Sequence, residues 1–372
     1  MRSSFRIKST GYTIHIGKDA FPSMQQFLTS GNPEGGPPVI LTDTNTARFC
    51  LPVLQKRVPA LSEAPVITIA SGEKNKTIAE TVRIWQELMN ITASRNSILI
   101  NLGGGVVMDM GGFAASTYKR GIRFIHVPTS LLGMIDASVG GKTGIDLDGY
   151  KNMVGTFTSP EAVYIDPVFL GTLEIRHKRA AFAEILKLGL VAGSTIWENL
   201  AASPLTFRLS QEITEDDMSK LLYDCLKIKN QIVKEDFREA GKRKILNFGH
   251  TVGHALESWS LANEKDPWLH GEAVAFGMLV AAILSFAHAG LSKEREDEIL
   301  TVLIRDFPFR DFESYYVDDL IHRMRQDKKN ADESIRFVLL DEIGTPLTDR
   351  VVEEKDIKLA MEQARKYILW WS

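Results

Sequence analysis

Short apolar runs that alternate with helical patterns constrain the fold of this chain more than any other feature. The β-rich runs in the first 130 residues are 39–41, 65–69, 97–100 and 123–127. Helix-spaced apolar residues fill 46–57 and 77–89 between them. Such alternation is typical of βαβ units and a parallel sheet, in which ligands bind beyond the carboxyl ends of the strands. The sequence therefore predicts an α/β domain with Asp43, Gly72 and Gly103 at its ligand-binding edge.

The second half of the chain changes character near residue 173. Helix-spaced apolar residues dominate 180–191, 218–234, 248–260 and 272–288, and 335–340 is a late strand-like exception. This periodicity predicts a mainly α-helical domain. We expect two domains, 1–172 and 173–372.

Charge and cysteine content exclude several classes of protein. Lys plus Arg total 44 and Asp plus Glu total 47, so the net charge of −3 does not indicate a nucleic-acid partner. Cys50 and Cys225 are too few for a disulfide framework. The apolar stretch 273–287 falls short of the about 20 residues that a membrane span needs, and the first residues do not resemble a secretory leader. We expect a cytoplasmic protein without a membrane partner.

Two glycine-rich segments resemble nucleotide-binding motifs without matching them. Met108 stands where the dinucleotide fingerprint that begins at Gly103 needs its third glycine. This glycine turn is either a tight turn alone or a pyrophosphate site at a helix N-terminus. Asp136 stands where a P-loop ending in Gly141-Lys142-Thr143 needs glycine, so ATP binding is not expected.

A cluster of histidines predicts a metal site. His250 and His254 lie four residues apart, on one face of the expected helix, and His270 begins a later helix. Glu184 and Lys187 lie within an apolar helical segment. Two histidines and one carboxylate form a common catalytic zinc set. The alternative is that the histidines are hydrogen-bonded in the core and that Glu184 only pairs with Lys187.

Basic residues recur beside glycine-rich turns and near the histidines. They are Arg120, Lys142, Lys151, Lys187, Lys229, Arg243 and the pair Lys328 and Lys329. In a net-acidic chain, cations gathered around a metal favour a small anionic substrate that carries phosphate and carboxylate. For each lysine alone, a solvated surface position is the alternative.

Taken in order, these segments resemble the sugar phosphate cyclases, and within them the 3-dehydroquinate synthases. The resemblance covers about residues 40 to 345. The motifs that carry it are Ser71-Gly-Glu73-Lys-Asn-Lys76, Gly103-Gly-Gly-Val-Val-Met-Asp109, Thr117-Tyr-Lys-Arg120-Gly, Pro128-Thr-Ser130, Asp136-Ala-Ser-Val-Gly-Gly-Lys142, Lys151-Asn152, Ala183-Glu184-Ile-Leu-Lys187, Arg243-Lys-Ile-Leu-Asn247-Phe-Gly-His250-Thr-Val-Gly-His254, His270-Gly-Glu272 and Asp327-Lys328-Lys329.

The resemblance implies a Rossmann-like NAD-binding domain followed by a helical domain that binds zinc or cobalt and the substrate. The implied metal ligands are Glu184, His250 and His270. The implied NAD site comprises Asp43, Asn45, Ser71, Gly72, Glu73, Lys74, Asn75, Lys76, Gly105, Val106, Val107, Met108, Asp109, Thr129, Ser130, Lys142, Lys151, Phe169, Leu170, Gly171 and Thr172. The implied substrate site comprises Asp136, Lys142, Asn152, Lys187, Lys229, Arg243, Asn247, His254 and Lys328. A homodimer is also implied, in which Arg120 reaches the neighbouring subunit's site.

The implied reaction converts 3-deoxy-D-arabino-heptulosonate 7-phosphate to 3-dehydroquinate and phosphate in the shikimate pathway. It combines transient oxidation by NAD, elimination of phosphate, re-reduction and an intramolecular aldol closure. Asp146 departs from the family, which usually has asparagine there, and Ser130 stands where threonine is common. Three alternatives remain: another cyclase of the superfamily, an NAD-dependent metal alcohol dehydrogenase, and a sugar-phosphate-binding module without catalysis.

Overall fold

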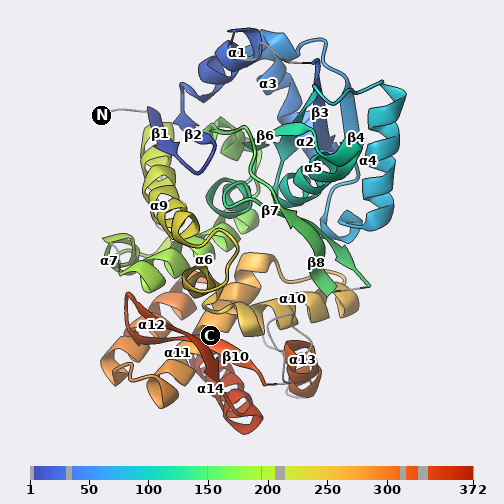
Figure 1. The fold of residues 1–372 in the computed structure, drawn as a ribbon. Coiled ribbons are helices and arrows are strands. Elements are labelled where there is room, and N and C mark those ends of the chain that lie inside the picture. Colours follow the sequence, from blue (N-terminus) through green and yellow to red (C-terminus); the bar gives the residue numbers. More distant parts are fainter. Residues whose placement is uncertain are drawn as a thin grey trace. The chain divides into compact units, whose positions relative to one another are not determined.

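The chain forms two compact units in the computed structural model, which describes residues 4–30, 36–148, 150–193, 195–205, 214–310, 316–325 and 334–371. One unit comprises Met1–Lys178 and Ile213–Phe237, and the other comprises Arg179–Glu212 and Arg238–Ser372. Helix α9 (Glu215–Glu235) groups with the first unit because it packs on strands β1 and β2, although it lies within the expected second domain. Figure 1 follows the chain through these elements.

A seven-stranded sheet forms the centre of the first unit, in the order β1-β2-β9-β6-β5-β3-β4. All neighbouring strands are parallel except β1 and β2. The strands are β1 (Ser4–Lys8), β2 (Thr13–Gly17), β3 (Pro38–Asp43), β4 (Val66–Ile69), β5 (Ile98–Gly103), β6 (Arg123–Pro128) and β9 (Ala162–Ile165). The four strands predicted in the first 130 residues, which are β3 to β6, are confirmed.

Helices surround this sheet. They are α1 (Ala20–Ser30), α2 (Thr44–Phe49), α3 (Leu51–Arg57), α4 (Ile78–Asn90), α5 (Gly105–Thr117) and α9, with short turns η1 (Pro59–Leu61), η2 (Glu73–Asn75), η3 (Tyr118–Arg120), η4 (Gly133–Ala137) and η5 (Pro167–Thr172). Of these helices, α1, α4, α5 and α9 contact strands of the sheet. The helical segment expected over 46–57 is divided into two helices, because α2 ends at Phe49 and α3 begins at Leu51. Pro52 explains the break, since proline fits the first turn of a helix but not its interior.

A separate hairpin follows η4 and belongs to the first unit. Strands β7 (Lys142–Leu147) and β8 (Tyr150–Phe157) pair antiparallel and contact α5. Gly112 on α5 permits this packing, because a Cβ there would lie 2.4 Å from the Cγ2 of Thr143.

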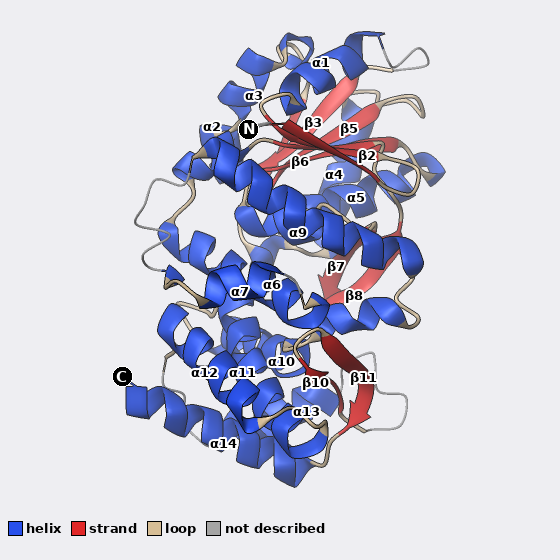
Figure 2. Cartoon of the chain, turned by 90° about the vertical axis from the view of Figure 1, so that its left-hand side faces the viewer, coloured by secondary structure: helices blue, strands red, loops and turns tan. Residues whose placement is uncertain are grey.

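The second unit is mainly helical, as predicted (Figure 2). Its helices are α6 (Ile175–Ala192, which begins in the first unit), α7 (Thr195–Ala201), α10 (His250–Asn263), α11 (His270–His288), α12 (Lys293–Asp306), α13 (Tyr316–Arg325) and α14 (Glu354–Trp371), with the short turn η6 (Lys242–Asn247). Strands β10 (Arg336–Glu342) and β11 (Thr345–Val351) form an antiparallel pair.

Helix α11 is the core of this unit. It contacts α10, α12, α14 and β10, and its residues from Ala273 to Ser285 are buried. By length and composition it is the one helix in the described chain that could cross a membrane, and 78% of its apolar window lies inside the fold. The apolar stretch 273–287, expected to be too short for a membrane span, thus belongs to a buried helix.

Candidate nucleotide and metal sites

The carboxyl ends of the parallel strands bring the glycine turn and its neighbours together. Strand β5 ends at Gly103 beside Pro128 of β6, and the Thr129 N–H donates a 2.8 Å hydrogen bond to the Gly103 carbonyl. Helix α5 begins two residues later, at Gly105. Its first N–H groups and its dipole are therefore placed at the edge where parallel sheets bind ligands.

The glycine turn also has a steric role. A Cβ on Gly103 would lie 2.5 Å from the Val107 side chain, and one on Gly104 would lie 3.2 Å from the Ser130 Oγ. The tight turn thus needs glycine whether or not a ligand binds. The two interpretations are compatible, because the same turn leaves the N-terminus of α5 without a side-chain cap.

Asp43 ends strand β3 and caps the helix that follows. Its carboxylate accepts hydrogen bonds from the N–H groups of Asn45 at 2.9 Å and Thr46 at 3.0 Å, and from the Thr46 hydroxyl at 2.8 Å. These bonds fix Asp43 and Asn45 at the carboxyl edge of the sheet.

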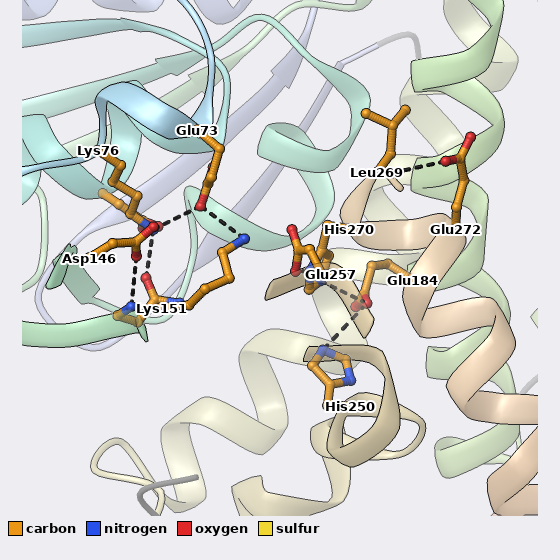
Figure 3. A network of polar contacts seen from close by, with 12 residues as sticks. Glu73, Lys76, Asp146, Lys151, Glu184, His250, Glu257, Leu269, His270 and Glu272 are labelled. Carbon is orange, nitrogen blue, oxygen red and sulfur yellow. Dashed lines mark hydrogen bonds and ion pairs between the residues drawn. The ribbon is translucent and has the colours of Figure 1, made fainter. Parts of the chain in front are cut away.

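Lys76 is buried and is the centre of a polar network whose other members are partly or fully exposed (Figure 3). Its Nζ donates to Asp109 Oδ2 at 2.7 Å and to Asn152 Oδ1 at 2.6 Å, and it lies 3.8 Å from Glu73 Oε1. Lys151 Nζ contacts the same Glu73 oxygen at 2.9 Å. Burial lowers the pKa of Lys76, but the carboxylates of Asp109 and Glu73 raise it more, so the pKa lies above its usual value.

Asp146 holds the backbone of Asn152. Its Oδ1 accepts the Asn152 N–H at 2.8 Å, while its own N–H donates to the Lys76 carbonyl at 2.9 Å. Asn152 has a φ of +53°, a backbone conformation that residues other than glycine rarely adopt. Burial raises the pKa of the Asp146 carboxyl above its usual value. The unusual aspartate is therefore engaged within the hairpin.

The other residues expected at the nucleotide and substrate sites of this unit lie on several helices, strands and short turns. Lys229 of α9 bonds to the carboxylate of Asp136 on η4. Cys50 is buried with both Thr129 and Thr172 as hydrogen-bond partners, and burial raises the pKa of its thiol to about 11. Ser71, Gly72, Lys74 and Asn75 lie on or beside η2, Val106 and Met108 on α5, Phe169, Leu170 and Gly171 on η5, Lys142 at the start of β7 and Arg120 at the end of η3.

Close helix packing in the second unit brings three elements together around the expected metal ligands. A Cβ on Gly271, next to His270, would lie 1.8 Å from the Ala180 carbonyl of α6. A Cβ on Gly277 would lie 1.9 Å from the Gly249 carbonyl, just before α10. Only glycine permits these approaches. They bring α6, α10 and α11 near enough for the side chains of Glu184, His250 and His270 to meet.

The donor atoms of these three residues converge (Figure 3). Glu184 Oε1 lies 3.5 Å from His250 Nε2 and 3.6 Å from His270 Nε2. Two ligand atoms bound to one tetrahedral zinc ion are separated by about 3.4 Å, since each bond is about 2.1 Å long. His254 lies beside them, and one ring nitrogen from each of the three histidines lies within 4.8 Å of the others. The residues present fit a divalent metal in both chemistry and spacing.

Some contacts expected from the alternative interpretation, in which the histidines and Glu184 have only structural partners, are also present. Glu184 and Lys187 form a buried ion pair, and His250 Nδ1 lies 3.1 Å from the Phe248 carbonyl. Despite these two contacts, Glu184 Oε1 still lies close to the Nε2 atoms of His250 and His270. Burial lowers the pKa of His270, but Glu257 and Glu184 outweigh it and raise the pKa to about 10. The pocket therefore favours a positive charge.

Arg243 and Asn247 lie on η6, immediately before the histidine helix. Arg243 is buried, and the Asn247 Nδ2 donates to Glu239 Oε1 at 2.6 Å. Lys187 and His254 lie within the same unit. Lys328 and Lys329 lie outside the residues that the structure describes.

Sequence reasoning did not assign a role to three side chains at these sites. Glu257 lies 3.0 Å from His270 Nδ1, Glu239 bonds to Asn247, and Asp146 bonds to Asn152. The sequence did contain a sign that Glu257 has a polar partner. It lies seven residues after His250 on a largely apolar helix, and a buried carboxylate needs a partner. The contact of Glu239 depends on a turn that periodicity does not predict.

The fold is that of the sugar phosphate cyclases. A 2-deoxy-scyllo-inosose synthase complexed with carbaglucose-6-phosphate, NAD+ and Co2+ matches with a TM-score of 0.84 and 23% identity, over 97% of this chain and 99% of that chain. The 2-epi-5-epi-valiolone synthase of Streptomyces hygroscopicus with NAD+ and Zn2+ matches with a TM-score of 0.81 and 22% identity, over 98% and 99%.

Sequence comparison identifies the particular family within this class. The models described as 3-dehydroquinate synthase N-terminal and C-terminal match residues 66–180 and 181–330. A 3-dehydroquinate synthase of Parabacteroides distasonis is 39% identical over 95% of this chain and 98% of its own length. The chain belongs to the 3-dehydroquinate synthase family, and it is an enzyme.

Proposed function

We propose that the chain converts 3-deoxy-D-arabino-heptulosonate 7-phosphate to 3-dehydroquinate and phosphate, as a carbon–oxygen lyase that uses NAD and one divalent metal. The observation that carries this proposal is the convergence of Glu184 Oε1 with the Nε2 atoms of His250 and His270 in a chain of this family. Relatives named 3-dehydroquinate synthase and a structural neighbour named 2-deoxy-scyllo-inosose synthase support the reaction class.

Glu184, His250 and His270 would hold the metal, zinc or cobalt, and the N-terminus of α5 with the Lys76 network would hold NAD. When bound, the metal acidifies a substrate hydroxyl, and NAD accepts a hydride and later returns it. Asp109 and Lys76 form the buried charge pair of the proposed nucleotide site. Lys76 also orients Asn152, so this pair connects the proposed nucleotide site to a residue proposed for the substrate.

Buried cations would bind the anionic groups of the substrate. Lys187 and Arg243 are buried in the second unit, and Lys229 is buried in the first. Lys187 is held by Glu184, and Lys229 is held by Asp136. Each ammonium is thus fixed before the substrate arrives, which lowers the entropy that binding costs. We include Lys142, Asn247, His254 and Lys328 in this set.

We propose a homodimer in which Arg120 enters the partner's site. The support is a set of three exposed apolar side chains on one face of α4, those of Ile78, Val82 and Met89. Met89 is 64% exposed, and the three side chains together form an apolar patch that a second copy of the chain would cover. Trp85 and Met89 also line a depression with Tyr118 and Lys119, next to Arg120.

Mixing two inactive variants tests the dimer. Arg120→Ala and His270→Ala are each expected to lose activity, and mixed dimers should regain one intact site, about a quarter of parental activity at equal amounts. Val82→Glu should shift the molecular mass in sedimentation toward the monomer, whereas Leu359→Glu on the exposed face of α14 serves as the control. No recovery on mixing would place Arg120 in its own subunit's site.

The decisive experiment for the reaction is incubation of the full chain with the heptulosonate phosphate, NAD and zinc. We expect one phosphate released per 3-dehydroquinate formed, with no accumulation of NADH at 340 nm. NADH rising mole for mole with product would favour the dehydrogenase alternative, and a different cyclic product would favour another cyclase. His270→Ala should lose metal and activity together.

The compartment and the partners are proposed on the remaining observations. Cys50 and Cys225 are free and buried, which agrees with a reduced cytoplasmic compartment. The net charge of −3 supports a small anionic substrate held by local cations rather than a nucleic-acid partner. We propose no membrane partner.

A further inference from the structure

We propose that Glu257 is a positioning residue for His270 and thereby sets the affinity of the metal site. This inference rests on the proposed metal set of Glu184, His250 and His270. Glu257 itself is not a proposed ligand, since the contact it makes with His270 involves the ring nitrogen that faces away from Glu184.

The His270 ring is held between two carboxylates. Its Nδ1 lies 3.0 Å from Glu257 Oε2, and its Nε2 lies 3.6 Å from Glu184 Oε1. Glu257 comes from α10, whereas His270 is the first residue of α11. The Glu257 side chain is only 6% exposed, so the contact is shielded from solvent.

This arrangement assigns different tasks to the two ring nitrogens. An ionised carboxylate only accepts hydrogen bonds, so the bond to Glu257 places a ring proton on Nδ1. With one proton held on Nδ1, Nε2 is the nitrogen that would give up its proton to bind a metal ion, as a histidine ligand requires. The hydrogen bond also fixes the rotation of the ring.

His270 depends on such a partner more than His250 does. The His270 side chain is 22% exposed, against 8% for His250, so surrounding atoms enclose its ring less completely. His250 Nδ1 faces the neutral carbonyl of Phe248 at 3.1 Å. The carboxylate of Glu257 is therefore the stronger outer partner, and it lies beside the ligand that packing restrains less.

Charge supports the same role. A divalent ion at this buried position needs negative charge nearby, because buried charge is costly unless it is balanced. Glu184 supplies one negative charge and is also paired with Lys187. Glu257 supplies a second negative charge, which acts on the ion through the His270 ring. This charge makes Nε2 of His270 a stronger electron donor to the metal.

Metal affinity measured by competition with a chromogenic chelator at one fixed pH tests the proposal on the full chain. We expect Glu257→Ala to bind Zn2+ about 10- to 100-fold more weakly than the parent, as outer-partner substitutions do. Glu257→Gln should lose less, because its amide oxygen still accepts the Nδ1 proton while the charge is gone. Glu296→Gln is the control, since Glu296 is similarly buried and pairs with Lys293 instead of a histidine.

The absorption spectrum of the Co2+-loaded protein separates positioning from mere support of the fold. A role in orienting His270 predicts altered visible bands in Glu257→Ala, with the circular dichroism of the metal-free protein unchanged. Zn2+ affinity within about twofold of the parent, with an unchanged Co2+ spectrum, would overturn the proposal. Should Glu257→Ala fail to fold, Glu257→Gln decides by the same criterion.

Failure of this inference is distinguishable from failure of the proposed function. If the parent binds no metal, the metal set itself is wrong. If the parent binds metal through His270 and all Glu257 variants bind it equally, only the role of Glu257 is wrong, and product formation by the parent remains a separate measurement.

Discussion

The Nζ of Lys76, which is buried, donates a 2.6 Å hydrogen bond to the side-chain oxygen of Asn152, which is exposed. Lys76 follows the short turn η2 at the end of β4, whereas Asn152 lies on the β7–β8 hairpin. One ammonium thus connects a residue proposed for NAD with a residue proposed for the substrate. Substitutions here should affect both ligands.

Lys76→Met is expected to weaken NAD binding at least about tenfold and to destabilise the fold by about 3–5 kcal/mol, because it leaves the Asp109 carboxylate without its buried cation. Methionine retains most of the side-chain volume, so loss of charge is the main change. Titration with NAD and urea unfolding measure the two effects. Lys56→Met, at an exposed position on α3, should change neither. Parental NAD affinity in Lys76→Met would contradict a role for this network in nucleotide binding.

Asp146→Asn is expected to be nearly silent, whereas Asp146→Ala should lower kcat/KM about tenfold. The 2.8 Å bond from the Asn152 N–H needs only an acceptor oxygen, which asparagine also provides. Alanine removes that acceptor at a residue with φ +53°, and a lost hydrogen bond of about 1–1.5 kcal/mol corresponds to about a factor of ten. Phosphate release over a range of substrate concentrations measures kcat/KM. Equal losses in both variants would show that the charge of Asp146 matters rather than its acceptor.

The strands that are buried along their whole length could be predicted from the sequence. Strands β3 and β5 are almost entirely buried and read as continuous apolar runs that end in aspartate or glycine. Hairpin β7–β8 escaped prediction because it mixes buried and exposed side chains, with Leu147 and Met153 about 40% exposed. Helix α9 has a clear helical period, yet periodicity does not say which unit it packs against.

The candidate metal site was predictable only in part for a related reason. His250 and His254 share a helix face, so spacing alone brings them together. The approach of Glu184, and of Glu257 to His270, depends on contacts between helices that glycines permit. Spacing along the chain does not encode such contacts, and the resemblance to the family supplied the ligand set.

The buried His126 is expected to make the free energy of unfolding fall as the pH is lowered. Burial lowers the pKa of this histidine to about 3, and its ring nitrogen Nδ1 lies 3.3 Å from Asn101 Nδ2 inside the sheet. The unfolded chain binds the proton at a pKa of about 6.5, so the neutral folded form loses stability as the pH falls from 6.5 toward 3. At pH 5 the loss amounts to about 2 kcal/mol.

Urea unfolding at pH 7.5 and pH 5, with chelator present, measures this dependence. His126→Gln should remove about 2 kcal/mol from the difference in unfolding free energy between the two pH values, whatever its effect on absolute stability. His177→Gln, at an exposed position, should leave the difference unchanged. An identical pH dependence in His126→Gln and the parent would show that His126 is not the titrating group.

Arg243→Lys is expected to lower kcat/KM about tenfold to a hundredfold, although it conserves charge. Arg243 is 3% exposed and lies on η6, four residues before Asn247, on the segment that leads into the histidine helix. A guanidinium makes two parallel bonds to one carboxylate, whereas an ammonium is a point charge, and one charge-assisted bond contributes about 1.5–3 kcal/mol. The reciprocal control is Lys244→Arg on the same turn, where the lysine bonds to Asp349 and should tolerate the exchange. Steady-state kinetics with the heptulosonate phosphate measure both variants. A kcat/KM for Arg243→Lys within twofold of the parent would mean that Arg243 does not make two parallel hydrogen bonds to the substrate carboxylate. The proposal of this substrate would then lose its main support in the second unit.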